Sequence, residues 1–176
     1  DDNFAIVLLL KEGSNFESFQ EKDLYTTGSL VKIEKVAESK ASFDMIVEVL
    51  DRVEVKEINQ TNDYYVGEYK IEPDIEDLDN TTKKQMLEYI KELTNEINGK
   101  FIGSESYIQY IQGLKDLEKI ISYLIQFIPI SSVEKQEFLE IKSKKKKSMK
   151  FLDILIQHKE NIKFQMEINA KLTGEV

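Results

Sequence analysis

The apolar residues of this chain change their spacing near residue 75. Before that point they fall mainly at every second position, as in strands that are half-buried in a sheet, and after it they recur every three or four positions, as on one face of a helix. Sheets and helices bury their apolar surfaces in different ways, so the change predicts an α+β fold in two parts. We expect a β-rich subdomain over residues 1–75 and a helical bundle over residues 76–176.

Five short strands are expected in the first part, spaced about a dozen residues apart and joined by polar turns, which is typical of a β-barrel or sandwich. The first is a continuous apolar run that suits a strand buried on both faces, and Pro73 ends the series. The predicted strands are Phe4–Leu10, Leu30–Val36, Phe43–Leu50, Val53–Ile58 and Tyr64–Ile71.

The second part is expected to contain several helices that pack into a bundle. The first helix follows the N-cap-rich segment 77–81 and should close at Gly99 and Gly103. Shorter helices are expected at 105–112, 115–128 and 133–141, and Pro129 stops the second of these. The last helix, residues 143–172, would be about 45 Å long. Its apolar stripe thins toward Asn169, so its far end should lie in solvent or against a partner.

The charge is distributed unevenly. The whole net charge of −9 lies in residues 1–75, which hold 17 acidic and 8 basic side chains. The run Lys142–Lys150 is the only basic patch, and it contains no aromatic side chain and no arginine. We interpret it as the solvated first turn of the last helix, and we do not expect nucleic acid as a partner.

No grouping of residues indicates catalysis or metal binding. The chain has no cysteine, which excludes disulfides and thiolate chemistry and favours a reducing compartment, the cytoplasm. The single histidine, His158, is expected to be exposed on the polar face of the last helix. Gly99-Lys100 lacks the earlier glycine of a phosphate loop. The acidic cluster at residues 74–79 lacks the glycine of a calcium loop, and we assign it to the positive end of a helix dipole.

No apolar stretch approaches the roughly 20 residues that a membrane-spanning helix requires, so no membrane partner is expected. The chain begins at Asp1 without methionine, which predicts a fragment of a longer protein. Phe16 and Phe19 stand out because they lie in the otherwise polar loop 13–22. Such rings either fold back and seal the barrel or remain exposed as a binding site.

A first motif resembles a known family. Residues 23–33, Asp-Leu-Tyr-Thr-Thr-Gly-Ser-Leu-Val-Lys-Ile, are similar to the signature D-L-[FY]-x-x-G-[TS]-x-[AV]-x-I of the amino-terminal domain of Lon, the ATP-dependent protease. In this motif Gly28 is expected at a tight turn into a strand, with Tyr25 packed beside it.

Two further matches follow in the family's order. Residues 47–55 resemble V-x-G-x-x-R-x-x-[IV], where Arg52 is the only arginine of the chain and Val49 replaces the family's glycine. Ile128-Pro129-Ile130 and Lys135-Gln136 with Leu139-Glu140 resemble M-P-L followed by K-Q-x-x-L-E. Members of the family open with a further strand and helix, which this chain would lack.

The resemblance implies a non-catalytic region that recognises unfolded or damaged proteins and supports hexamer assembly. ATP, Mg²⁺ and the Ser-Lys dyad of the serine protease would belong to modules outside the chain. Phe16 and Phe19 are the candidate substrate contacts, and a metal site is not expected. An alternative is a stand-alone Lon-type domain that acts as a ligand-binding or adaptor module. The motif residues with an expected structural role are Tyr25, Gly28, Arg52, Pro129 and Gln136.

Overall fold

A computed structural model describes residues 3–97 and 105–174 and divides the chain into two compact units. The first, here called the β unit, comprises residues 1–74 and 133–142, and the second, the helical unit, comprises residues 75–132 and 143–176. The first change from one unit to the other falls between residues 74 and 75. The segment 133–142, expected in the helical bundle, instead belongs to the β unit. The side chain of Arg52 donates to its backbone carbonyls, and its Gln136 side chain donates to the backbone of the sheet.

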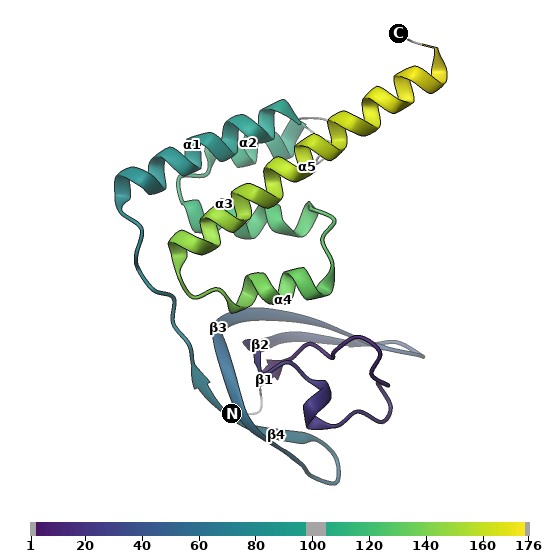
Figure 1. Cartoon of the computed structure of the whole chain (residues 1–176). Helices are drawn as coiled ribbons and strands as arrows, with labels where there is room; N and C mark the ends of the chain where they lie inside the picture. Colours follow the sequence, from purple (N-terminus) through teal and green to yellow (C-terminus); the bar gives the residue numbers. More distant parts are fainter. Residues whose placement is uncertain (1–2, 98–104, 175–176) are drawn as a thin grey trace. The chain divides into compact units, whose positions relative to one another are not determined.

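The described strands of the β unit form one antiparallel sheet with neighbours in chain order, β1-β2-β3-β4 (Figure 1). Their bounds are β1 Phe4–Val7, β2 Thr27–Glu38, β3 Phe43–Gln60 and β4 Tyr65–Ile71. A short 3-10 helix, η1, spans Glu21–Asp23, and α4 spans Ser132–Glu140. Together with the helices given below, these elements confirm the predicted α+β class.

The sheet has four strands where the sequence predicted five, because β3 continues through Asp51 and Arg52. These two polar residues pair with Leu30 and Ser29 of β2, and a register shift between Leu30 and Val31 accommodates the extra residue. A pair of polar residues therefore did not end the strand. The first strand ends at Val7 rather than Leu10, and it is not buried on both faces, since Val7 is 54% exposed.

The helical unit contains α1 Asn80–Glu96, α2 Glu105–Gly113, α3 Leu117–Leu124 with the 3-10 turn η2 Ile125–Phe127, and α5 Lys144–Thr173. Helix α1 contacts α2, α3 and α5. Apolar residues at helical spacing form the core, as their pattern predicted. Its largest fully buried side chains are Phe151, Ile90, Ile111, Ile120, Leu124 and Leu155.

Local capping sets the beginnings of the helices. The Asp79 carboxylate accepts a hydrogen bond from the backbone N–H of Thr82, and the Ser143 hydroxyl accepts one from Lys146. Gly174, with φ of 73°, ends α5 in the left-handed conformation. The predicted start of α1 is confirmed, whereas its predicted closure at Gly99 and Gly103 lies outside the described residues. The far end of α5 is exposed as expected, with Leu172 80% exposed.

Candidate functional site

An apolar hollow lies on the sheet of the β unit. It has a volume of about 560 Å³, and its lining comes from β1, the loop that follows it, and strands β2, β3 and β4. The aromatic members of the lining are Phe4, Phe19, Tyr64, Tyr65 and Tyr69. Four of these five keep much of their surface in water, with exposed fractions of 46–64%, while Phe19 is half-buried. A concave apolar surface of this kind can take up apolar side chains of another polypeptide.

The loop between β1 and η1 forms one side of the hollow. Its base is closed by a hydrogen bond from the backbone N–H of Lys11 to the carbonyl of Asp23 at 2.7 Å. Gly13 in this loop adopts φ of 80°, and the side-chain oxygen of Asn15 accepts from the N–H of Glu17. The loop is thus a closed element with its own turns.

The structure separates the two candidate rings of this loop. The ring of Phe19 lies 5.4 Å from that of Tyr65, tilted by 32°, and both line the hollow. Phe16 is 81% exposed and does not line it. The sequence left two alternatives open, sealing the sheet or remaining exposed as a binding site. Phe19 packs against the sheet, whereas Phe16 is exposed to solvent.

The motif suggested that Gly28 lies at a tight turn. In the structure Gly28 is instead the second residue of β2. A Cβ at this position would lie 2.3 Å from the carbonyl oxygen of Val7 and 2.4 Å from Leu8 Cδ2. The family motif therefore needs glycine because two backbones approach closely here. The hydroxyls of Thr26 and Thr27 donate to the two carboxylate oxygens of Glu54 at 2.7 and 2.8 Å, which holds β2 against β3 at this point.

Tyr25 lies immediately before this close approach. Its backbone N–H donates to the carbonyl of Leu9 at 2.9 Å, and Lys11 Nζ lies 5.7 Å from the centre of its ring. The side chain is half-buried. Tyr25 thus holds the base of the loop that carries Phe16 and Phe19.

Arg52 and Gln136 attach α4 to the sheet within the β unit. Arg52 Nη1 lies 2.7 Å from Asp74 Oδ1 and donates more weakly to the carbonyls of Leu139 and Ile141, at 3.4 and 3.3 Å. Gln136 is buried, and its Nε2 donates to the carbonyl of Thr27 at 2.9 Å and to Glu140 Oε1 at 3.0 Å. These family-motif residues therefore place α4. Pro129 is exposed and follows η2, where it contributes no such contact.

The acidic cluster and the lysine run meet within the two units. In the helical unit, Lys144 pairs with Glu76 and with Glu118, and the backbone N–H of Lys145 donates to Asp77. These hydrogen bonds lower the pKa of Glu76 and raise that of Lys144. In the β unit, a hydrogen bond from Lys142 lowers the pKa of Glu72. The sequence suggested that the lysine run is solvated. It is not wholly so, because Lys142 and Lys144 form ion pairs.

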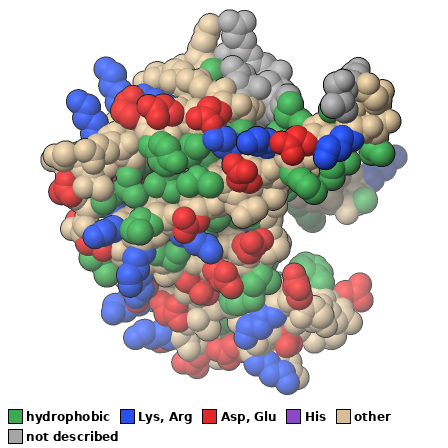
Figure 2. Space-filling model, turned by 45° about the horizontal axis from the view of Figure 1, so that its top comes forward, with side chains coloured by type: hydrophobic (Ala, Val, Ile, Leu, Met, Phe, Trp, Pro, Cys, Tyr) green, Lys and Arg blue, Asp and Glu red, His purple; other side chains and the backbone are tan. Residues whose placement is uncertain are grey.

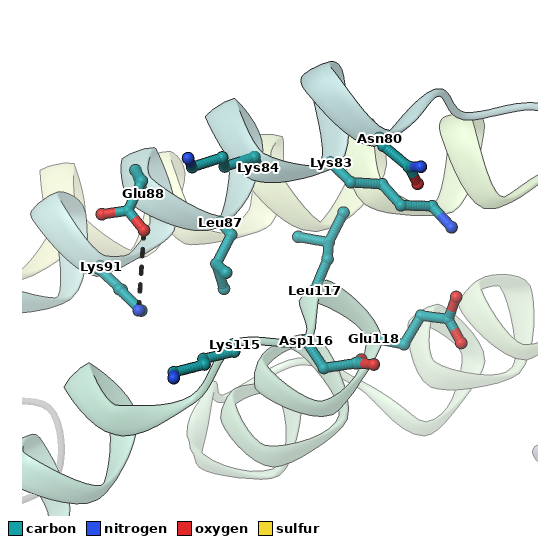
Figure 3. Close-up of a pocket in the computed structure, with 10 residues that line it drawn as sticks. All are labelled: Asn80, Lys83, Lys84, Leu87, Glu88, Lys91, Lys115, Asp116, Leu117 and Glu118. Atoms are coloured by element: carbon teal, nitrogen blue, oxygen red, sulfur yellow. Dashed lines mark ion pairs between the residues drawn. The ribbon is translucent and has the colours of Figure 1, made fainter.

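A second hollow, of about 520 Å³, lies between α1 and the beginning of α3 (Figure 3). Lys83, Lys84 and Lys91 line it from α1, and Lys115, Asp116 and Glu118 line it from the opposite side. Lys91 pairs with Glu88 at 3.8 Å and Lys83 with Glu76 at 3.4 Å. Charges of both signs line this groove, so it does not present the single charge of an ion-binding site.

His158 is half-buried on α5 rather than exposed, and burial lowers its pKa. Within residues 3–97 and 105–174, no three His, Asp or Glu side chains are grouped so that they could hold a metal ion. Among the same residues, no helix is both long and apolar enough to span a bilayer. Figure 2 shows one face of the molecule, on which hydrophobic side chains are exposed between acidic and basic ones.

The comparison with protein families decides the relationship. Residues 1–157 match the family described as the ATP-dependent protease La (LON) substrate-binding domain. The chain belongs to the Lon substrate-binding domain family. The resemblance inferred from the three motifs is thereby confirmed.

Curated Lon relatives align along nearly the whole chain. The Lon protease of Clostridium beijerinckii is 36% identical over 173 residues, covering 98% of this chain and 22% of the relative. That of Methanosarcina barkeri is 31% identical over 172 residues, covering 98% and 21%. The chain therefore spans about a fifth of the length of these relatives.

A solved structure shares the fold. The N-terminal domain of a Lon protease from the Mycobacterium avium complex superposes with a TM-score of 0.62 at 14% identity, covering 89% of this chain and 92% of that one. At this identity the likeness concerns the arrangement of the sheet and helices alone.

Proposed function

We propose that this chain is the non-catalytic, substrate-recognising part of a cytoplasmic Lon-type ATP-dependent serine protease, and that it binds unfolded or damaged proteins. The observation that carries the proposal is the apolar hollow of the β unit with its partly exposed aromatic rings. Unfolded chains differ from folded ones chiefly in the apolar segments that they expose. A surface that keeps aromatic rings in water selects for such segments, because burial of each ring stabilises the complex.

Phe16 and Phe19 contribute differently to this proposal. Phe16 offers a ring that is already in contact with water and can cover an incoming side chain. Phe19 shapes the hollow through its contact with Tyr65. Replacement of Phe16 should therefore reduce affinity alone, whereas replacement of Phe19 should also affect the fold.

Catalysis and assembly belong to the longer protein in this proposal. Because the chain covers only about a fifth of its Lon relatives, the ATPase module with ATP and Mg²⁺ and the Ser-Lys dyad are assigned to other parts. The purified chain should then hydrolyse neither ATP nor protein. Self-association into a hexamer would use surfaces such as the far end of α5, where Phe164 and Leu172 are exposed.

Binding of a reduced, alkylated and therefore permanently unfolded protein, followed by fluorescence anisotropy, tests the proposal. Phe16→Ser and Tyr65→Ser should each weaken binding by about 1–2 kcal/mol, because each removes an aromatic contact. Tyr89→Ser is the matched control, since Tyr89 is a 44% exposed tyrosine on α1 of the helical unit. If the wild-type chain fails to bind the unfolded protein, or if all three variants bind as the wild type does, the proposal is wrong.

A further inference from the structure

One edge of β3 is open over half of the strand. On one side, Phe43–Glu54 pairs with β2, but on the other side β4 pairs only with Val53–Gln60. Among the described residues no strand lies beside Phe43–Asp51 on that second side. The β2–β3 hairpin accordingly extends beyond the rest of the sheet (Figure 1). Backbone N–H and C=O groups along this edge are free to pair with another strand.

The side chains along this edge are apolar on one face. Successive residues of a strand point to opposite faces, so Phe43, Met45, Val47 and Val49 share a face. Their exposed fractions are 66%, 57%, 39% and 66%. Proteins usually protect an open edge with lysine, proline or a short strand, whereas this edge offers four adjacent apolar side chains to water.

The other face of the same stretch carries the carboxylates of Asp44 and Glu48, with Lys32 of β2 directly opposite Glu48 and Lys35 opposite Ile46. Asp44, Ile46 and Glu48 alternate with the apolar residues, and no basic residue occurs in β3 from Phe43 to Asp51. Side chains directly opposite each other on neighbouring strands interact most strongly. A strand laid against this edge would therefore be favoured if it placed Lys or Arg opposite Asp44, which has only Ala37 across from it on β2, and opposite Glu48.

We propose that the open edge of β3 at Phe43–Val49, here called the β3 edge, binds an extended, basic and apolar segment of an unfolded protein as an added strand. The inference rests on the proposed function and names the class of segment that is recognised. Backbone hydrogen bonds supply affinity for any sequence, since every unfolded chain has free N–H and C=O groups. The apolar and acidic faces then select segments in which apolar residues alternate with basic ones.

A second copy of the chain is a poorer occupant of the β3 edge. Antiparallel pairing of two such edges about Ile46 would place Asp44 of one chain opposite Glu48 of the other, and like charges at opposed positions destabilise a strand pair. Pairing about Val47 would place the same carboxylates opposite Leu50 and Ile46, which offer them no opposite charge. The two carboxylates thus oppose self-pairing while they favour a basic ligand. Neutralising both should therefore increase self-association of the chain.

Labelled peptides of about twelve residues test the proposal with the full chain. One peptide alternates Val with Lys, a second replaces Lys by Glu, and a third keeps the Lys sequence but carries N-methyl groups along one edge. In fluorescence anisotropy the Lys peptide should bind about 10-fold more tightly than either of the other two. Equal affinity for the methylated peptide would overturn strand addition, and equal affinity for the Glu peptide would overturn charge selection.

Variants of the chain locate the binding site. Phe43→Ser, and separately Asp44→Asn with Glu48→Gln, should weaken binding of the Lys peptide about 5-fold or more. Tyr89→Ser on α1 is the control, because Tyr89 is an aromatic residue of the helical unit that is 44% exposed. Val49→Thr removes apolar surface while it keeps a strand-forming residue, so it tests the same edge if Phe43→Ser misfolds, which circular dichroism would show. Wild-type affinity in all of these edge variants would overturn the proposal.

The two proposals can fail separately. If the β3 edge variants bind an unfolded protein as the wild type does while Tyr65→Ser does not, the edge is not a binding site and the proposed function stands. If the wild-type chain binds no unfolded protein, the proposed function itself is wrong.

Discussion

Arg52 and Asp74 form an ion pair at 2.7 Å that joins β3 to the segment following β4. The Arg52 side chain is only 7% exposed, and the same Nη1 atom also reaches the carbonyls of Leu139 and Ile141 near the end of α4. Its Nε and Nη2 atoms are buried, and residues 3–97 and 105–174 offer them no hydrogen-bond partner. The single arginine of the chain therefore connects three segments of the β unit. The Asp74 carboxylate and the carbonyls of Leu139 and Ile141 are the acceptors that stabilise its guanidinium.

Replacement of Arg52 by lysine should destabilise the β unit by about 2 kcal/mol. The lysine side chain is one atom shorter than that of arginine, so its ammonium would fall short of the position from which Nη1 contacts both Asp74 and the end of α4. Urea unfolding monitored by circular dichroism measures the change. Lys56→Ala, at an exposed position of the same strand, is the control and should change stability by less than about 0.5 kcal/mol. Equal stability of the two variants would contradict the role assigned to Arg52.

Gly28→Ala should destabilise the chain by about 2–3 kcal/mol, because the added Cβ would meet the backbone oxygen of Val7 at 2.3 Å. The backbone of β1 would have to move to accommodate it. Gly113→Ala is the matched control, since a Cβ there has no neighbour within 4 Å. It ends α2 and should be neutral or slightly stabilising. Thermal unfolding of both variants checks the difference, and a Gly28→Ala protein as stable as the wild type would refute the close approach.

Gln136→Ala should cost about 1–2 kcal/mol, because it leaves the carbonyl of Thr27 without its donor from α4. Gln126→Ala is the control, since Gln126 makes only a local, exposed hydrogen bond to the carbonyl of Tyr123. Chemical denaturation of both variants gives the free energies of unfolding. A larger loss for Gln126→Ala than for Gln136→Ala would show that Gln136 does not hold α4.

Stability should fall as the pH is lowered below about 4.5. Hydrogen bonds from Lys142, Lys144 and Ser143 lower the pKa values of Glu72, Glu76 and Asp77 from their ordinary values of 4.5 and 3.8. The unfolded chain then binds protons more readily than the folded one, so this contribution is present above the ordinary values and is lost as the pH falls through the lowered ones. A series of thermal midpoints between pH 7 and about pH 3 measures the loss.

Asp77→Asn should reduce this dependence on pH, because it removes one of the carboxylates whose pKa is lowered in the folded chain. Glu12→Gln, at an exposed position of the loop after β1, serves as the control. If the two variants lose stability with the same slope between pH 5 and about pH 3, the contacts of Asp77 do not contribute to the acid sensitivity.

Much of the local structure follows from residues that are close together in the chain. Asp79 caps α1 and Ser143 caps α5, because each side chain accepts a hydrogen bond from the backbone N–H three residues later. The apolar residues spaced along α1 form its buried face. Such interactions involve neighbours within one helical turn, so they can be predicted from the sequence. The prediction from sequence missed the continuity of β3 across Asp51 and Arg52, because pairing with β2 maintains the strand there.

The candidate site could be predicted only in part. Phe16 and Phe19 were recognisable as aromatic residues in a polar loop, but their different exposures depend on Tyr65, which is 46 positions beyond Phe19. The open edge of β3 likewise could not be predicted from the spacing of apolar residues in the sequence. The run Phe43–Val49 reads as an ordinary strand until the pairing shows that β4 reaches only to Val53.

The amino-acid sequence by itself determined the change from sheet to helices near residue 75, the capped ends of the helices and the motifs that indicated the Lon family. These depend on periodicity, capping and residue identity, which act over a few neighbouring positions. Only the tertiary structure decided that α4 belongs with the sheet. Gln136 reaches Thr27 across 109 positions of the chain and Arg52 reaches Leu139 across 87, and such contacts arise from the packing of the folded unit rather than from any local pattern.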